Sequence, residues 1–347
     1  VAGVAHAHGL LRQWLMAQYG APIGEETGTE QDLIIVGMGK LGGGELNVSS
    51  DIDLIFIYPE DGNTNGNRQR SNHEFFTQLG RKLINALNDA TAEGFVFRVD
   101  MRLRPYGDSG PLVSSFAALE AYLHTQGREW ERYAWIKGRA LCGDQEGLLQ
   151  IVRPFVFRKY LDFGAYGSMR NLHVQIRREV ARKEMQDNIK LGPGGIREIE
   201  FIAQVFQLIR GGRDRALQVK PTRAVLRYLA SQQLLPGETV DELIAAYEFL
   251  RNLEHRLQYL EDGQTQTLPR NDVDRQLIAE TMGFADFASF MPALDAHRQK
   301  VTRYFEQVFS TQQDESEHPL EPLWNDVEQA QTAELLQHAR DKLAGFF

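Results

Sequence analysis

The sequence has little cysteine and no long apolar run. Its 347 residues include a single cysteine, Cys142, so no disulfide can form within the chain. A lone thiol fits a reducing compartment, and we therefore expect a cytoplasmic protein. No stretch reaches the roughly eighteen consecutive apolar residues of a membrane span, and no signal-peptide pattern opens the chain. These absences predict a soluble protein with no membrane partner.

Acidic residues are scarce in residues 151–230, although the chain as a whole is acidic. The formal net charge is −9, but residues 151–230 carry sixteen Lys and Arg against seven Asp and Glu, a local charge of +9. Such a basic stretch can bind phosphate or an acidic partner, although most of these side chains fit a solvated helix surface equally well. No interleaved basic and aromatic pattern accompanies it, so we expect no nucleic-acid partner.

Residues 33–58 form the stretch around which we expect the chemistry. A short β-branched run at 33–36 predicts a strand, and the alternating residues 51–58 predict a second strand. The loop between them has five glycines, whose backbone N–H groups, with Lys40 as a mobile cation, suit a phosphate. Candidate phosphate- or nucleotide-binding residues in this stretch are Gly37, Gly39, Lys40, Gly42, Ser49 and Ser50.

Paired carboxylates follow the glycine loop. Asp51 and Asp53 are two residues apart, so a strand places both on one face of its sheet. Two adjacent carboxylates repel each other unless a divalent cation lies between them, and Mg²⁺ or Mn²⁺ accepts such oxygen ligands together with substrate phosphates. This pattern indicates metal-assisted phosphoryl or nucleotidyl transfer.

A third carboxylate lies in the alternating segment 95–105. We expect a strand there with Asp100 on the same face as Arg98, Arg102 and Arg104. Asp100 is then either part of a plain ion-pair cluster or a third metal ligand, with Arg102 and Arg104 facing substrate phosphates. We favour the second interpretation, so that Asp51, Asp53 and Asp100 are the candidate catalytic and metal-binding residues.

Simpler interpretations of the stretch remain open. Residues 37–42 match the dinucleotide pattern G-x-G-x-x-G, with Glu60 near the position of the ribose acid, but only 43–50 separate them from the next strand, too few for a crossover helix. A Walker loop is excluded, because Leu41 stands where that loop needs Ser or Thr to bind the metal. Asp51 could be a turn residue and Asp53 a solvent-facing one, although strands are depleted in Asp.

The remaining apolar periodicities set the expected architecture. Helical spacing predicts a helix over 73–87, another from 116 with Ser115 as N-cap, and only helices beyond about 150, including one that starts at a capping box over 239–242. The sequence therefore predicts an α+β protein. We expect a small mixed sheet with flanking helices over 1–150, an α-helical bundle over 151–310, and an acidic linker over 311–347.

Several long phrases carry a family resemblance. GMGKLGGGELN, SSDIDLIF, RVDMRLRP and NIKLGPGGIREIEFIAQVFQLIRGGR resemble the bifunctional glutamine synthetase adenylyltransferase/adenylyl-removing enzymes, which belong with the nucleotidyltransferases related to polymerase β. They look like the N-terminal, adenylyl-removing half. The resemblance implies that the chain is a piece of a longer protein and that the linker leads to a missing C-terminal adenylyltransferase half.

The resemblance also implies an activity. It implies a nucleotidyltransferase-like catalytic domain over 1–150 that removes AMP from a tyrosine of glutamine synthetase by phosphorolysis, with orthophosphate as co-substrate and ADP as product. It further implies that segment 190–201 closes over the nucleotide, which makes Lys190, Arg197 and Glu200 site candidates. Glu198 and Glu200 diverge by roughly 200° on a helix and cannot both face one ligand.

Two other functions remain open at this stage. Transfer of AMP from ATP to the tyrosine would use the same carboxylates. The chain could also be a regulatory module that binds the PII signal protein, which is an expected partner in either case.

Overall fold

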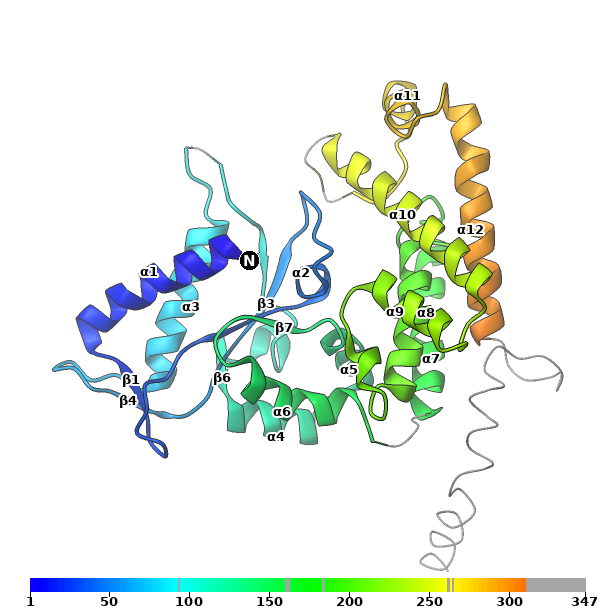
Figure 1. Cartoon of the computed structure of the whole chain (residues 1–347). Coiled ribbons are helices and arrows are strands. Elements are labelled where there is room, and N and C mark those ends of the chain that lie inside the picture. The colour runs from blue at the N-terminus through cyan, green and yellow to red at the C-terminus, as the bar shows by residue number, and fades with distance from the viewer. Residues whose placement is uncertain (93, 160–162, 183–184, 261–262, 264, 310–347) are drawn as a thin grey trace, which may run out of the picture.

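The computed structural model describes residues 1–92, 94–159, 163–182, 185–260, 263 and 265–309. A small sheet with flanking helices comes first and a group of helices follows, as predicted (Figure 1). The elements of the first part are α1 (Ala2–Tyr19), β1 (Pro22–Gly24), β2 (Ile34–Gly37), α2 (Gly39–Gly43), β3 (Ile52–Tyr58), β4 (Gly62–Thr64), α3 (Asn72–Asn88), β5 (Val99–Asp100), η1 (Gly107–Ser109), β6 (Val113–Ser115), α4 (Phe116–Thr125), α5 (Glu129–Trp135), β7 (Arg139–Cys142) and α6 (Gln145–Val156). Those of the second are α7 (Phe163–Arg182), α8 (Ile196–Arg210), η2 (Arg215–Gln218), α9 (Thr222–Ser231), α10 (Gly237–Tyr259), α11 (Asp272–Thr281) and α12 (Phe287–Phe309).

Five strands form one mixed sheet, in the order β5-β3-β2-β7, with β6 also paired to β3. β2 and β3 are antiparallel, whereas β3 runs parallel to β5 and to β6. A dinucleotide-binding fold needs parallel strands joined by a crossover helix, and the connection here holds only the five-residue α2. The dinucleotide interpretation of residues 37–42 is therefore wrong.

The central strands β2 and β3 are buried on both faces. Alternate residues of a strand point to opposite faces, so each strand contributes to two layers. One face packs against α1 and α3 through Leu33, Ile35, Leu54, Phe56 and Tyr58. The other packs against α4, α5 and α6 through Ile34, Val36, Ile55 and Ile57. This second apolar layer continues without a break into the helical part, so the expected boundary near residue 150 stays a prediction.

The helical part is organised around α8, which is buried along almost its whole length, including the polar residues Glu198, Glu200, Gln204 and Gln207. α7, α9, α10 and α12 all contact it, and together they form the group on the right of Figure 1. Two of these helices, α10 and α12, carry a line of buried apolar residues at helical spacing. The buried members are Leu243, Tyr247, Leu250 and Leu257 on α10, and Phe290, Leu294, Val301, Phe305 and Val308 on α12.

Local predictions have mixed outcomes. Ser115 caps α4 as expected, since its hydroxyl accepts a hydrogen bond from the Ala118 N–H. The capping box over 239–242 is wrong, because α10 already begins at Gly237 and Glu242 instead pairs with Lys300 of α12 at 2.8 Å. The expected strand over 95–105 reduces to β5, because 101–104 turn away from the sheet.

Two expectations concern the ends and the surroundings of the chain. The acidic linker over 311–347 lies outside the described residues. Within the described residues, no helix combines the length and the apolar character that crossing a bilayer requires.

Replacing Leu79 by Ala tests the packing of α3 on the sheet. Leu79 is 0 % exposed, and removing a buried leucine side chain should lower the free energy of unfolding by about 2–5 kcal/mol, measured by urea denaturation. The matched control is Leu277→Ala on α11, where the leucine is 45 % exposed and the change should stay within about 0.5 kcal/mol. Equal losses in the two variants would contradict this packing.

Candidate active site

A cavity of about 600 Å³ lies between the sheet and the helical part, next to the glycine loop. Its walls come from the loop, the ends of β3 and β5, α5, the segment before α8, and α8 itself. Most of the predicted site residues line it. They are Gly39, Lys40, Ser49, Ser50, Asp51, Asp53, Asp100, Arg102, Lys190, Arg197 and Glu200.

Three predicted residues lie outside the lining of this cavity. Gly37 and Gly42 are buried beneath the loop, where a Cβ on Gly42 would stand 1.9 Å from the Lys137 carbonyl oxygen. Arg104 turns away, and its guanidinium donates to the Met101 carbonyl at 2.8 Å and lies 3.5 Å from Asp108. Arg104 points elsewhere because the backbone leaves the strand direction directly after Asp100.

The three aspartates meet at the junction of β3 and β5. Asp51 directly precedes β3, and Asp53 stands in register with Asp100 across the parallel pair. Arg98 Nε lies 3.2 Å from Asp51 Oδ1, and Arg102 Nη2 lies 2.6 Å from Asp100 Oδ2. The hydrogen bond from Arg102 holds the pKa of Asp100 below its usual range.

Burial, followed by the neighbouring Asp100 and Asp51 carboxylates, raises the pKa of Asp53 to about 6. The nearby charges of Lys190 and Arg102 lower the pKa of Asp53 only in part. The Oδ2 of Asp53 would lie 2.9 Å from a Cβ on Gly39, where φ is +50°, so the glycine loop lies directly against this carboxylate. No ion pair involves Asp53 within the described residues, and a bound cation would relieve the repulsion among the three groups.

The donor set fits a hard divalent cation, since it consists of carboxylate oxygens beside a cavity with cationic walls. In the part of the chain that the structure describes, however, no three His, Cys, Asp or Glu side chains already stand as a metal-binding group. Asp51 and Asp100 are instead paired with Arg98 and Arg102. The three-carboxylate site for Mg²⁺ or Mn²⁺ therefore stays a prediction.

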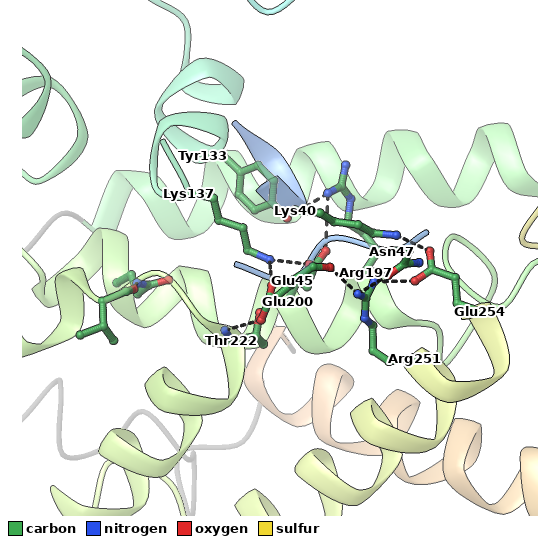
Figure 2. Close-up of polar contacts among 12 residues, drawn as sticks. Lys40, Glu45, Asn47, Tyr133, Lys137, Arg197, Glu200, Thr222, Arg251 and Glu254 are labelled. Carbon is green, nitrogen blue, oxygen red and sulfur yellow. Dashed lines mark hydrogen bonds and ion pairs between the residues drawn. The ribbon is translucent and has the colours of Figure 1, made fainter. Parts of the chain in front are cut away.

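Lys40 is not the mobile cation that the sequence predicts. Its Nζ lies 2.6 Å from Oε1 of Glu254 on α10, and the Glu254 side chain is fully buried (Figure 2). Burial lowers the pKa of Lys40 to about 8, although Glu254 acts in the opposite direction. Arg251 pairs with the other oxygen of Glu254 at 2.6 Å and also donates to the Asn47 side chain. Lys40 thus ties the loop to α10.

A second ionic cluster joins the same loop to the turn after α5, to α8 and to α9. Lys137 Nζ lies 2.8 Å from Glu45 Oε2 and 2.6 Å from Glu200 Oε1, and Glu45 also accepts a hydrogen bond from the Thr222 N–H at 2.8 Å (Figure 2). Burial would raise the pKa of Glu200, but Lys137 and Arg197 outweigh it and lower that pKa to about 2. Glu200 is therefore ionised and held in place at the cavity wall.

Glu198 and Glu200 diverge as predicted. Glu198 accepts hydrogen bonds from the Gly194 N–H at 2.9 Å and from Arg177 at 2.9 Å, on the side of α8 that faces α7. Only Glu200 reaches the cavity. Glu198 is thus a helix-start acid.

Sequence reasoning missed the partners that organise this site, namely Glu45, Lys137, Arg251 and Glu254. One signal was available for Glu254. It falls four residues after Leu250 and three before Leu257, on the apolar stripe of α10. Carboxylates are almost never fully buried without a partner, so the position of Glu254 on the apolar stripe predicts an ion pair. It does not identify the cationic partner.

Comparison with known proteins identifies the family to which the chain is related. A family model described as glutamate-ammonia ligase adenylyltransferase matches residues 2–152, and one described as GlnD PII-uridylyltransferase matches residues 170–309. A bifunctional glutamine synthetase adenylyltransferase/adenylyl-removing enzyme of Chromobacterium violaceum is 69 % identical over 313 residues, which are 90 % of this chain and 35 % of the relative. The chain belongs to this family.

Further relatives of the same name agree. That of Nitrosomonas eutropha is 65 % identical over 84 % of this chain and 32 % of the relative, and that of Aromatoleum aromaticum is 61 % identical over 93 % and 34 %. The chain thus spans about a third of the length of the curated relatives that it matches. The family resemblance carried by the glycine-loop and aspartate phrases is confirmed.

The buried pair between Lys40 and Glu254 should be worth more than an exposed one on the same helix. Glu254→Gln leaves Lys40 and Arg251 without a counter-charge, so the free energy of unfolding should fall by about 3–5 kcal/mol in urea denaturation. The matched control is Glu248→Gln, also on α10. Glu248 is 47 % exposed beside Arg223, and its loss should cost less than about 1 kcal/mol. A similar loss in both variants would count against a buried lock.

Glu200 should make the stability depend on acid pH. Its folded-state pKa of about 2 lies below the ordinary 4.5, so its ionised form stabilises the fold above pH 4.5, and this contribution is lost as the pH falls toward 2. Glu200→Gln should therefore show a shallower decline of the unfolding free energy over this range than the parent chain. Parallel pH profiles would contradict the assignment.

Proposed function

We propose that the chain removes AMP from an adenylylated tyrosine of glutamine synthetase by phosphorolysis. The observation that supports this best is that Asp51, Asp53 and Asp100 line the same cavity as Arg102, Lys190 and Arg197. Acidic residues for a metal and basic residues for phosphate oxygens are what a nucleotidyl transfer requires. The direction of transfer rests on the resemblance to the adenylyl-removing half of the family.

The proposed reaction has one bond-forming and one bond-breaking event. An oxygen of orthophosphate attacks the α-phosphorus of the AMP group, and the bond from that phosphorus to the tyrosine oxygen breaks. ADP leaves, and the tyrosinate takes up a proton to become the free phenol. With an ordinary pKa of about 10, a phenol is already a fair leaving group, so the site needs no dedicated acid.

The aspartates and the cationic wall divide the work. Asp51, Asp53 and Asp100 would hold Mg²⁺ or Mn²⁺, which when bound gathers phosphate oxygens and neutralises charge on the departing phenolate. Arg102, which is 73 % exposed, is free to move from Asp100 to orthophosphate once a cation satisfies that carboxylate. Arg197 is stacked over the Tyr133 ring at 5.4 Å and presents a fixed charge.

The loop and the aromatic wall position the substrate. Lys40 is engaged with Glu254, so we assign it to holding the loop instead of binding orthophosphate directly. Ser49 and Ser50 line the cavity beside Asp51 and can contact the nucleotide. Trp130 is 40 % exposed and lines the same cavity, where its ring offers a stacking face for adenine.

The opposite transfer, from ATP to the tyrosine, would use the same groups and is the second candidate, because the relatives' name includes both activities. One assay distinguishes the two. The chain is incubated with adenylylated glutamine synthetase, Mg²⁺ and orthophosphate, and ADP is measured with and without orthophosphate. Phosphate-dependent ADP supports removal. If AMP-tyrosine forms from ATP and unmodified synthetase while no ADP is released, the direction of transfer is the reverse of the one proposed. If neither ADP nor AMP-tyrosine forms, the proposal is overturned.

Asp53→Asn should abolish this turnover without unfolding the chain. Losing a ligand of a cation that stabilises the transition state by several kcal/mol should lower the rate at least about a hundredfold. The control is Asp272→Asn, whose carboxylate is 99 % exposed on α11, and which should keep the parent rate. A normal rate in Asp53→Asn would exclude the metal role.

A further inference from the structure

A second cavity, of about 340 Å³, lies between α6, the turn after α5, and residues 215–220. Its apolar wall includes Trp135, Leu148 and Val152, which also belong to the main core. The segment 130–140 separates it from the first cavity, since Tyr133 and Lys137 line the first while Trp135 and Arg139 line the second. None of the aspartates discussed above reaches it.

The charged side chains of this second cavity are all cationic. Arg139, Arg153, Arg215 and Lys220 line it, and no Asp or Glu does. Within the described residues none of the four has an ion-pair partner, although the chain as a whole is acidic. Four cations without a carboxylate are therefore gathered around one apolar hollow.

The partners of these cations are neutral oxygens. Lys220 Nζ donates to the Ile136 carbonyl at 2.9 Å, Arg139 to the Leu41 carbonyl at 3.0 Å, and Arg153 Nε to the Gln218 side chain at 3.0 Å. The Nε of Arg139 is buried and has no hydrogen-bond partner. Burial, with repulsion from Arg153 and Arg139, lowers the pKa of Lys220 to about 8.

Ordinary surface charge does not explain this arrangement. A solvated lysine keeps its charge at no cost, whereas a partly buried ammonium beside two guanidinium groups is unfavourable unless an anion compensates it. The fold maintains the arrangement at three separate points of the chain. An anion that enters the cavity would satisfy the open donors and relieve the repulsion at once.

We propose that this cavity is a binding site for a small organic anion with an apolar body. Lys220, Arg139 and Arg153 would bind its carboxylate or phosphate group, and its body would pack against Trp135, Leu148 and Val152. The volume is within the usual range of small-molecule sites, which combine apolar walls with a few polar anchors.

The position of the site links it to the glycine loop. Arg139 holds the Leu41 carbonyl of α2, and Lys220 holds the Ile136 carbonyl, one residue before Lys137. Lys137 in turn binds Glu45 and Glu200 at the first cavity. An anion that draws Arg139 and Lys220 toward itself would thus act on the segment that both cavities share.

Calorimetric titration of the full chain with four probes tests the site. Phenyl phosphate and phenylacetate each combine an anionic head group with an apolar ring. Inorganic phosphate has only the anionic group, and benzyl alcohol has only the ring. At least one of the two organic anions should bind at least about tenfold more tightly than both partial probes, a difference of about 1.4 kcal/mol. Which of the two binds identifies the head group.

Variants assign the binding to this cavity. Lys220→Met and, separately, Arg153→Gln should each weaken the organic anion about tenfold or more, while thermal unfolding checks that both are folded. Arg102→Gln in the first cavity and the exposed Arg227→Gln on α9 should leave this affinity unchanged. Loss in Arg102→Gln with retention in both cavity variants would overturn the proposal, as would the absence of binding by either anion up to ~10 mM.

Discussion

The contact between the glycine loop and the helical part depends on two groups of buried charges. Lys40, Glu254 and Arg251 form one, and Lys137 with Glu45 and Glu200 forms the other. Removing such charges from water costs several kcal/mol per ion, so they are tolerated only when each meets its partners in good geometry. A loop that shifted by one residue would leave a carboxylate buried without a counter-ion. The clusters therefore define one position of the loop more than they add stability.

The first cavity follows from that fixed position. One wall, with the aspartates, comes from strands in the first third of the chain, and the opposite wall, with Lys190, Arg197 and Glu200, comes from the entry to α8. Neither wall is a site by itself. Docking brings the two walls around the same space and leaves Asp53 desolvated next to two like charges. Buried carboxylates with a raised pKa are typical of functional sites, because a bound ligand can supply the compensating charge.

The segment 130–140 contributes to the lining of both cavities. Tyr133 and Lys137 line the first cavity, and Trp135 and Arg139 line the second. The Ile136 carbonyl accepts a hydrogen bond from Lys220. The cationic second cavity, which no carboxylate of the described residues lines, and the cavity with the aspartates therefore lie on either side of this segment. Lys137, one residue after Ile136, joins this segment to Glu200 and to Glu45 of the glycine loop.

The sequence by itself determined what short-range geometry controls. Alternation fixed the two central strands and the common face of Asp51 and Asp53, and a helical repeat of 3.6 residues separated Glu198 from Glu200. Only the tertiary structure decided which strands pair and which charged side chains contact each other. In the folded chain β2 and β3 are antiparallel, and β5 ends at Asp100, so that Arg104 turns away from the cavity. Lys40 pairs with the carboxylate of Glu254, 214 residues later. A charged side chain carries no local mark of its distant partner, because the partner is selected by burial and packing of the whole chain.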